Sequence, residues 1–252
     1  MSPVSQIQRS VFVNDSIGRL NNVQEINADF NVPVSVETKI SEWQVSSITG
    51  KKKCFERIEK NRSCLTMLVQ LPAGRSFKKF GHNWGVEFFV LSGFFSDSDR
   101  DYNAGCYMRN LAGTYHDVFT RDGCIVLLKL GWFQPLDRKR IVIESKNSEA
   151  RWLTVSEPGI SRLVLHHFSE ESVDLYRIRS ECWLTFRHKK HGLELFVCEG
   201  TITVKGKCYE VGDWLRYPAG SRVKVSAIGD VCLYAKKYIF PLTKISTVCK
   251  RI

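Results

Sequence analysis

The chain contains the stretch VEFFVLSG at residues 86–93 and a second version of it, LELFVCEG, at residues 193–200. The two stretches are separated by a shift of 107 positions. Without a gap, the same shift carries Tyr102 to Tyr209, Gly105 to Gly212, Arg109 to Arg216, Gly113 to Gly220 and Lys129 to Lys236. A repeat at a fixed offset indicates a duplicated structural unit. The chain is therefore predicted to contain two copies of one domain.

Both copies carry the local signals of strands rather than helices. Short runs rich in Val, Ile, Leu and Phe are separated by glycine, asparagine, aspartate or proline. These runs are Thr66–Leu71, Phe88–Leu91, Ile125–Leu130, Phe196–Val197, Thr201–Val204 and Val231–Ala235. Many short strands with glycine turns are typical of a sandwich or barrel, so an all-β fold is predicted.

Composition bounds the class of protein. A chain of 252 residues with 43% hydrophobic content can bury one large core or two small ones. No apolar run approaches the roughly 20 residues that span a bilayer, and the N-terminal sequence MSPVSQIQRS lacks the pattern of a signal peptide. We expect a soluble, cytoplasmic protein with no membrane partner.

The nine cysteines are an odd number and include no CxxC pair. This pattern argues against both a disulfide framework and a zinc ribbon. Several of the cysteines lie in apolar runs, where a free cysteine behaves as a small core residue. We expect them to be mostly reduced and buried.

The basic residues outnumber the acidic ones, 37 to 26, which gives a net charge of +11. Basic clusters occur at Lys51–Lys53, Arg138–Arg140 and Arg187–Lys190, but they are scattered and no nucleic-acid-binding motif accompanies them. A generally basic, solvated surface is predicted, without a nucleic-acid partner.

The pair His166 and His167 has no matching acid or nucleophile and is expected at a loop or strand edge.

The first copy resembles the cupin domain of ChrR-type anti-sigma factors, within the RmlC-like cupin superfamily. Gly105, the stretch Leu111-Ala112-Gly113 and His116 fit the family's second motif, Gly-x5-Pro-x-Gly-x2-His, with leucine in place of proline. The stretches FSD, DYNAG and DGC look like the family's FSD, DYPAG and EGC, and Trp43 and LPAG also have counterparts; they occupy residues 95–97, 101–105, 122–124, 43 and 71–74. The resemblance implies a tandem bicupin, two double-stranded β-helix (jelly-roll) barrels, and cupins are often homodimers.

The resemblance covers residues 28–240 and implies four segments. These are an N-terminal extension at 1–27, cupin domain 1 at 28–134, cupin domain 2 at 135–240 and a C-terminal tail at 241–252. The boundary is placed near Gln134–Asp137, where a proline follows an apolar run. The zinc motif His-x3-Cys-x2-Cys, by which ChrR-type proteins hold a sigma factor, is absent from the sequence, so we do not expect sigma-factor sequestration by that route.

The resemblance places the four metal positions of domain 1 at Phe80, His82, Val86 and His116. A divalent metal needs several lone pairs to replace its lost hydration, and Phe80 and Val86 supply none. His82 and His116 are thus an incomplete metal site, for which the family implies zinc, iron or manganese. A barrel interior lined by Phe80, Val86 and Tyr107 could instead hold a small ligand, or side chains could fill it, as in most small barrels.

In the second copy the same positions fall on Arg187, Lys189, Leu193 and Val223, and no metal ligands are expected there. Glu87 is not expected to replace Val86 as a ligand, because neighbouring side chains of a strand face opposite ways. A bulge could bring Glu87 to the ligand position, but nothing in the sequence requires one.

Glu87 and Arg109 nevertheless recur as Glu194 and Arg216, where no metal is expected. We therefore predict two structural pairs, Glu87–Arg109 and Glu194–Arg216, each closer than about 6 Å and each linking neighbouring strands.

Two functions follow from these expectations. The first is a non-catalytic bicupin that binds an unidentified small ligand or protein partner, or that has a regulatory role. The second is a metal-dependent, dioxygenase-like cupin enzyme that uses His82 and His116. Function depends on the site and not on the fold, and the incomplete site favours the first. No catalytic or organic-cofactor residue is assigned.

Overall fold

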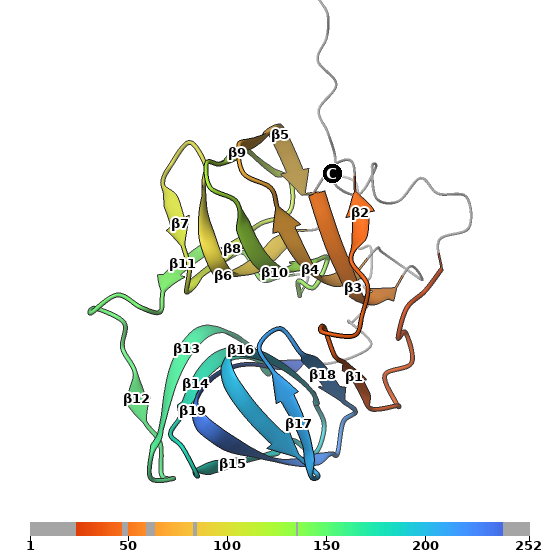
Figure 1. The fold of residues 1–252 in the computed structure, drawn as a ribbon, viewed down its shortest axis with the longest axis vertical. Coiled ribbons are helices and arrows are strands. Elements are labelled where there is room, and N and C mark those ends of the chain that lie inside the picture. Colours follow the sequence, from red (N-terminus) through yellow and green to blue (C-terminus); the bar gives the residue numbers. More distant parts are fainter. Residues whose placement is uncertain (1–23, 47–49, 59–63, 83–84, 135, 239–252) are drawn as a thin grey trace, which may run out of the picture.

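The computed structural model describes residues 24–46, 50–58, 64–82, 85–134 and 136–238. These residues form strands, turns and loops and no α-helix, which confirms the predicted all-β class. The described part of the chain accordingly contains no helix that could cross a membrane. Two curled sheets make up the molecule (Figure 1).

The first sheet contains ten strands among the described residues, and its main order is β11-β8-β6-β10-β4-β3-β2, with β5, β7 and β9 pairing beside this path. Their bounds are β2 (Gln44–Ser46), β3 (Gly50–Ile58), β4 (Cys64–Leu71), β5 (Arg75–His82), β6 (Val86–Ser96), β7 (Asp101–Asn103), β8 (Cys106–Asn110), β9 (Thr114–Thr120), β10 (Cys124–Leu130) and β11 (Ile141–Glu144). Every strand pairing is antiparallel.

The second sheet contains nine strands among the described residues, in the main order β1-β18-β16-β19-β14-β13-β12, with β15 and β17 beside this path. Their bounds are β1 (Val34–Val36), β12 (Leu153–Thr154), β13 (Ile160–Phe168), β14 (Glu171–Ile178), β15 (Trp183–Arg187), β16 (Gly192–Val204), β17 (Lys207–Glu210), β18 (Trp214–Tyr217) and β19 (Arg222–Tyr238). Pairings such as β16–β19 and β14–β19 repeat those of β6–β10 and β4–β10.

The two sheets exchange a strand. β1 comes from the first half of the chain but pairs with β18, so that Val34 lies opposite Arg216. β11 comes from the second half but pairs with β8, so that Ile141 lies opposite Arg109. The shift of 107 positions relates both members of these pairings, so the exchange is reciprocal. Sheet membership therefore crosses the boundary expected near residue 134 in both directions.

Side chains alternate between the two faces of each repeated strand, and this alternation explains where the cores form. In β6, Val86, Phe88 and Val90 enter the interior of the first barrel, whereas Phe89 enters a cluster between the two barrels. Because neighbouring residues of a strand face opposite sides, one nearly continuous apolar run serves both cores. In β16, Phe196 takes the place of Phe89 between the barrels.

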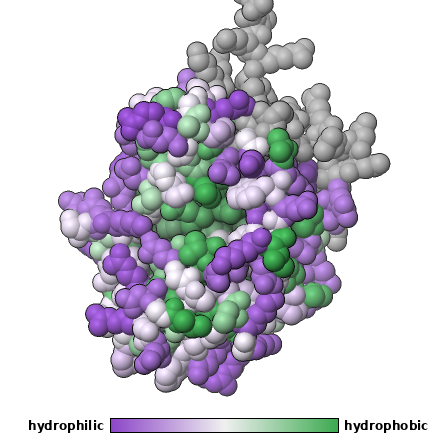
Figure 2. Space-filling model, viewed as in Figure 1, coloured by the Kyte–Doolittle hydropathy of each residue, from purple (hydrophilic) through white to green (hydrophobic). Residues whose placement is uncertain are grey.

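The cluster between the barrels is formed by side chains from both halves. Phe55 of the first half stacks on Trp214 of the second half, with ring centroids 5.8 Å apart. Leu127 and Tyr234 belong to the same cluster and are buried. In the view of Figure 2, hydrophobic residues are gathered in the hollow between the two halves, and hydrophilic residues cover much of the remaining face.

The last glycine of each repeated stretch is required by the close approach of another strand. Gly93 and Gly200 both have positive φ, at 69° and 80°. A Cβ at Gly93 would lie 2.1 Å from the carbonyl oxygen of Gly123, and one at Gly200 would lie 2.3 Å from that of Asp230. Only glycine meets both conditions, because it has no Cβ and adopts positive φ without steric cost.

Candidate functional site

The metal positions of the first barrel do not provide a complete ligand set. Val86 is 1% exposed and packs in the apolar interior. The side chains of Phe80, His82 and His116 lie outside the described part of the structure, but the backbone register pairs Phe80 with His116 and His82 with Thr114. Positions 82 and 116 are therefore diagonal neighbours on the β5–β9 ladder. Among the described side chains, no group of three His, Cys, Asp or Glu residues is placed to hold a metal.

Two of the four metal positions of the second barrel lie one residue earlier than the sequence comparison placed them. The ungapped shift predicted Arg187 opposite Val223, but Phe186 lies opposite Val223, and Arg187 lies opposite Arg222. The cause is an irregularity in β5 between Phe77 and Phe80, where that strand holds one extra residue.

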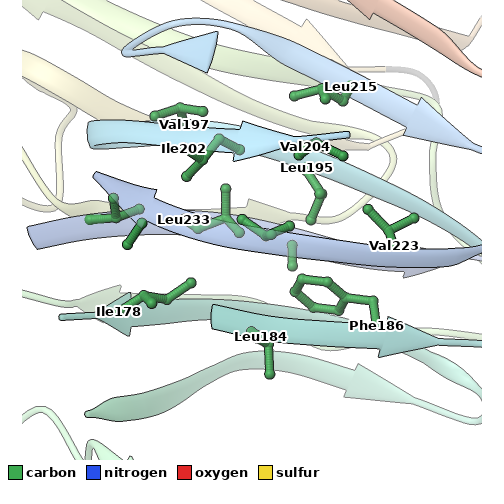
Figure 3. Packing of buried hydrophobic residues seen from close by; sticks show 14 of the residues in the cluster. Ile178, Leu184, Phe186, Leu195, Val197, Ile202, Val204, Leu215, Val223 and Leu233 are labelled. Atoms are coloured by element: carbon green, nitrogen blue, oxygen red, sulfur yellow. The ribbon is translucent and has the colours of Figure 1, made fainter. Parts of the chain in front are cut away.

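The second barrel therefore lacks the family's ligands for a different reason from the one predicted. Phe186, Leu193 and Val223 are buried together in its apolar interior, where Figure 3 shows Phe186 and Val223. Arg187, in contrast, is exposed. His188, and not Lys189, then matches His82. Apolar side chains, rather than repelling cations, therefore occupy three of the four positions.

Val86 and Tyr107 were predicted to line one pocket, but the structure does not bring them together. Val86 belongs to the interior of the first barrel, and Tyr107 belongs to the cluster between the barrels. Met108, the next residue of β8, packs in the barrel interior. Tyr107 consequently faces the opposite side of the sheet.

A group of charged and polar side chains is buried between the barrels. We call it the junction network, and none of its members is more than 3% exposed. Its members are Glu56, Glu87, Arg109, Lys129, Asp137, His166, Glu171, Glu194, Arg216, Tyr234 and Lys236. Buried charges require paired and hydrogen-bonded partners, and the contacts below provide them.

Two reciprocal ion pairs connect the halves of the chain. Lys129 Nζ lies 2.8 and 2.6 Å from the two carboxylate oxygens of Glu194. Lys236 Nζ lies 3.1 Å from Glu87 Oε2. The shift of 107 positions relates Lys129 to Lys236 and Glu87 to Glu194, so the lysine of each copy binds the glutamate of the other copy.

The arginines of the two copies have different partners. Arg109 Nη1 lies 2.8 Å from Glu87 Oε2, so this predicted pair is in direct contact. For the second predicted pair the structure gives other partners: Arg216 donates to Glu56, and Glu194 accepts from Lys129 and from Trp214 Nε1. Arg216 and Glu194 are nevertheless opposite each other in the β16–β18 register. Their strand positions were predicted correctly, but their choice of partner depends on the packing of the two barrels.

The electrostatics of Glu87 follow from its surroundings. Burial alone would raise the pKa of Glu87, but the positive charges of Lys236, Arg109 and Lys129 outweigh burial and lower this pKa. Tyr234 also donates a hydrogen bond of 2.5 Å to Glu87 Oε1. Glu87 is therefore held as a carboxylate in the junction.

Three acidic members of the network and its histidine were missed or misplaced by the sequence reasoning. His166 lies inside β13 and not at a strand edge, and its Nε2 is 2.7 Å from Asp137 Oδ2. Asp137, which lies at the predicted domain boundary, also accepts a hydrogen bond of 2.5 Å from Arg109. Glu171 Oε1 lies 3.0 Å from Lys236 Nζ, and Glu56 pairs with Arg216. For His166 the available signal was a polar residue within an apolar strand.

Two open grooves lie on the outside of the second barrel. One has a volume of about 570 Å³ and is bordered by Arg177, Arg179, Glu199 and Asp230, so its charges are balanced. The other has a volume of about 470 Å³ and lies over β15 and β19. Neither groove opens at the family's metal positions in the first barrel.

Comparison with known proteins identifies the fold of both halves. Residues 31–134 match the model of the ChrR cupin-like domain family, and no curated protein sequence gives a significant match. A proposed dioxygenase from Nostoc punctiforme is 12% identical, with a TM-score of 0.69 and 85% of each chain covered.

Two enzymes of similar architecture extend this comparison. Salicylate 1,2-dioxygenase from Pseudoaminobacter salicylatoxidans is 11% identical, with a TM-score of 0.58, 83% of this chain covered and 82% of that chain. Oxalate decarboxylase from Bacillus subtilis is 11% identical, with a TM-score of 0.57, and the shares are 83% and 78%. At such identities the likeness establishes the fold, which is the predicted bicupin.

Proposed function

Because residues 31–134 are a ChrR cupin-like domain within a bicupin fold, we propose that this protein is a non-catalytic bicupin that acts by binding a ligand or a protein partner. One observation carries this proposal: apolar side chains occupy interior metal positions in both barrels. Val86 is buried in the first barrel, and Phe186, Leu193 and Val223 are buried in the second.

The chemistry of these positions supports the proposal. A cupin metal is held by imidazole and carboxylate groups, and each missing ligand removes a large share of the binding free energy. In the first barrel His82 and His116 remain as candidates, without the carboxylate. The residues present therefore do not fit a complete metal site of this family.

The repeated charged residues support the same proposal. Glu87 and Glu194 would be the natural carboxylates to consider for a metal, but they bind Lys236 and Lys129 between the barrels. Their role is to hold two barrels in a fixed relation. Such a rigid scaffold suits a protein that presents binding surfaces.

Metal analysis of the full chain purified without chelators tests the proposal. We expect zinc, iron and manganese well below one equivalent, unchanged in the double variant His82→Ala, His116→Ala. The matched control is His167→Ala, His191→Ala, which removes two histidines away from the cupin motif. Near-stoichiometric metal that is lost in the first variant and retained in the second would overturn the proposal.

The second candidate is a metal-dependent, dioxygenase-like enzyme. It is favoured by the diagonal placement of positions 82 and 116 on the β5–β9 ladder and by a salicylate dioxygenase among the proteins of similar fold. This candidate requires near-stoichiometric metal that is lost in the double variant His82→Ala, His116→Ala. It also requires oxygen consumption that depends on both histidines.

A further inference from the structure

Some charged residues occur in both copies and are needed by the fold, whereas others occur in one copy only. The repeated pair Lys129 and Lys236 belongs to the junction network in both copies. Charged residues that are exposed and present in one copy only do not join the barrels. The charged residues that line the groove of about 470 Å³ on the second barrel are of this exposed, unrepeated kind.

The groove is positively charged. Lys205, Arg222 and Lys224 line it, and no acidic residue is among its lining residues. The hydroxyl groups of Thr185, Thr203 and Ser226 also line it and can donate hydrogen bonds. Three cations and three hydroxyls in one concave surface form a suitable environment for an anion.

The register of β15 and β19 brings a further cation to this face. Arg187 lies directly opposite Arg222, and both side chains are exposed. Like charges directly opposite each other on paired strands are destabilising. Among the described residues, no ion pair compensates Arg187, Lys205, Arg222 or Lys224. A bound anion would relieve this repulsion.

An exposed aromatic ring borders the groove. Trp183 is 55% exposed and lies opposite Ser226, a lining residue, in the β15–β19 register. Lys224 Nζ is 4.5 Å from the centroid of the Trp183 ring. The apolar part of a small ligand could therefore contact Trp183 while its anionic part meets the cations.

The fold itself does not require these cations. At the shift of 107 positions, Arg222 and Lys224 correspond to Tyr115 and Asp117 on β9 of the first barrel. The same two strand positions are neutral and acidic there. Their positive charge is thus specific to the second barrel.

We propose that this groove binds a small phosphate ester. Its phosphate group is held by Lys205, Arg222 and Lys224 and receives hydrogen bonds from the threonine and serine hydroxyls. Arginine and lysine are the usual partners of phosphate, because their charged donors form strong hydrogen bonds to its oxygens. The site lies on the outer surface, so it is independent of whether the first barrel binds a metal.

Calorimetric titration of the full chain at low salt tests the site, with two phosphate esters, AMP and glycerol 3-phosphate, as probes. We expect saturable binding of at least one probe at one site per chain. The double variant Arg222→Gln, Lys224→Gln should weaken binding by at least about tenfold, because it removes two of the three lining cations. The control variant Arg138→Gln, Lys139→Gln removes the same net charge elsewhere and should bind as the natural protein does.

Three outcomes would overturn the proposal. They are no saturable binding of either probe, an equal loss in the groove and control variants, and binding of a single-stranded oligonucleotide at least tenfold tighter than AMP. Thermal unfolding of the single variant Arg222→Gln without ligand provides a second measurement. Relief of the Arg187–Arg222 repulsion should leave its Tm unchanged or raised, whereas a structural role would lower it.

Discussion

At the scale of single residues, the buried acid–base groups around Asp137 decide how the junction responds to pH. His166 and Arg109 both contact Asp137. Burial lowers the pKa of His166, the charge of Arg109 lowers it further, and Asp137 and Glu87 oppose these two effects only in part. His166 is therefore held in its neutral form, hydrogen-bonded to Asp137.

This arrangement predicts a loss of stability on mild acidification. Below about pH 6.5 the unfolded chain protonates His166, whereas the folded protein, with its lowered pKa, does not. The unfolded state then binds more protons than the folded state. The free energy of unfolding therefore decreases as the pH falls below about 6.5.

Denaturant unfolding between pH 7 and pH 5 checks this expectation. Burial raises the pKa of Glu56 despite the charge of Lys129. The raised pKa of Glu56 increases the free energy of unfolding as the pH falls, which is opposite to the effect of His166. Variants must therefore isolate the contribution of the histidine. The decrease in unfolding free energy should be smaller in His166→Gln than in the natural protein. The exposed neighbour variant His167→Gln should keep the full decrease, and equal curves for all three proteins would contradict the assignment.

At the scale of elements, each repeated stretch ends in a glycine against which another strand packs. Gly200 has positive φ and no room for a Cβ, whereas Gly229 has a similar φ of 71° but nothing within 4 Å of an added Cβ. The two positions separate steric clash from backbone strain. Gly200 lies inside β16 and Gly229 inside β19, where the register between these two strands shifts.

Alanine substitutions use this contrast. We expect Gly229→Ala to cost about 1 kcal/mol, the usual cost of forcing positive φ on alanine. Gly200→Ala should cost more than about 3 kcal/mol, because its Cβ also collides with the backbone of Asp230. Chemical denaturation measures both, and equal costs would show that the close approach at Gly200 does not constrain the fold.

Much of the element-level structure could be predicted from the sequence, for identifiable reasons. The repeat and the two-residue periodicity are local patterns, so they indicated paired strands and placed Glu87 away from the metal face. The extra residue in β5 could not be seen by an ungapped comparison, so Arg187 was given the place of Phe186. The partners of Glu194 and Arg216 depend on how the barrels pack, which no local pattern contains.

At the scale of the whole molecule, two barrels are joined by exchanged strands, an apolar cluster and the junction network. β1 and β11 each complete the sheet of the other half. Lys129–Glu194 and Lys236–Glu87 cross between the halves in the same reciprocal manner. The charged residues that recur at the fixed shift therefore join the two copies, whereas the described core clusters inside the barrels are apolar.

A double-mutant cycle on Lys129→Met and Glu194→Gln tests this central claim most directly, with unfolding free energy as the measured quantity. Each single change leaves a buried partner unpaired and should cost about 3–5 kcal/mol. The double variant should cost less than the sum, by about 1–3 kcal/mol.

The matching cycle on Lys236→Met and Glu87→Gln should give coupling of the same sign, because the two pairs are related by the repeat. The control cycle on Lys129→Met and Glu199→Gln, whose glutamate is exposed and pairs with Lys146, should be additive within about 0.5 kcal/mol. Coupling between Lys129 and Glu194 that is absent from the control is the predicted result. Additivity of Lys129 and Glu194 would contradict the account.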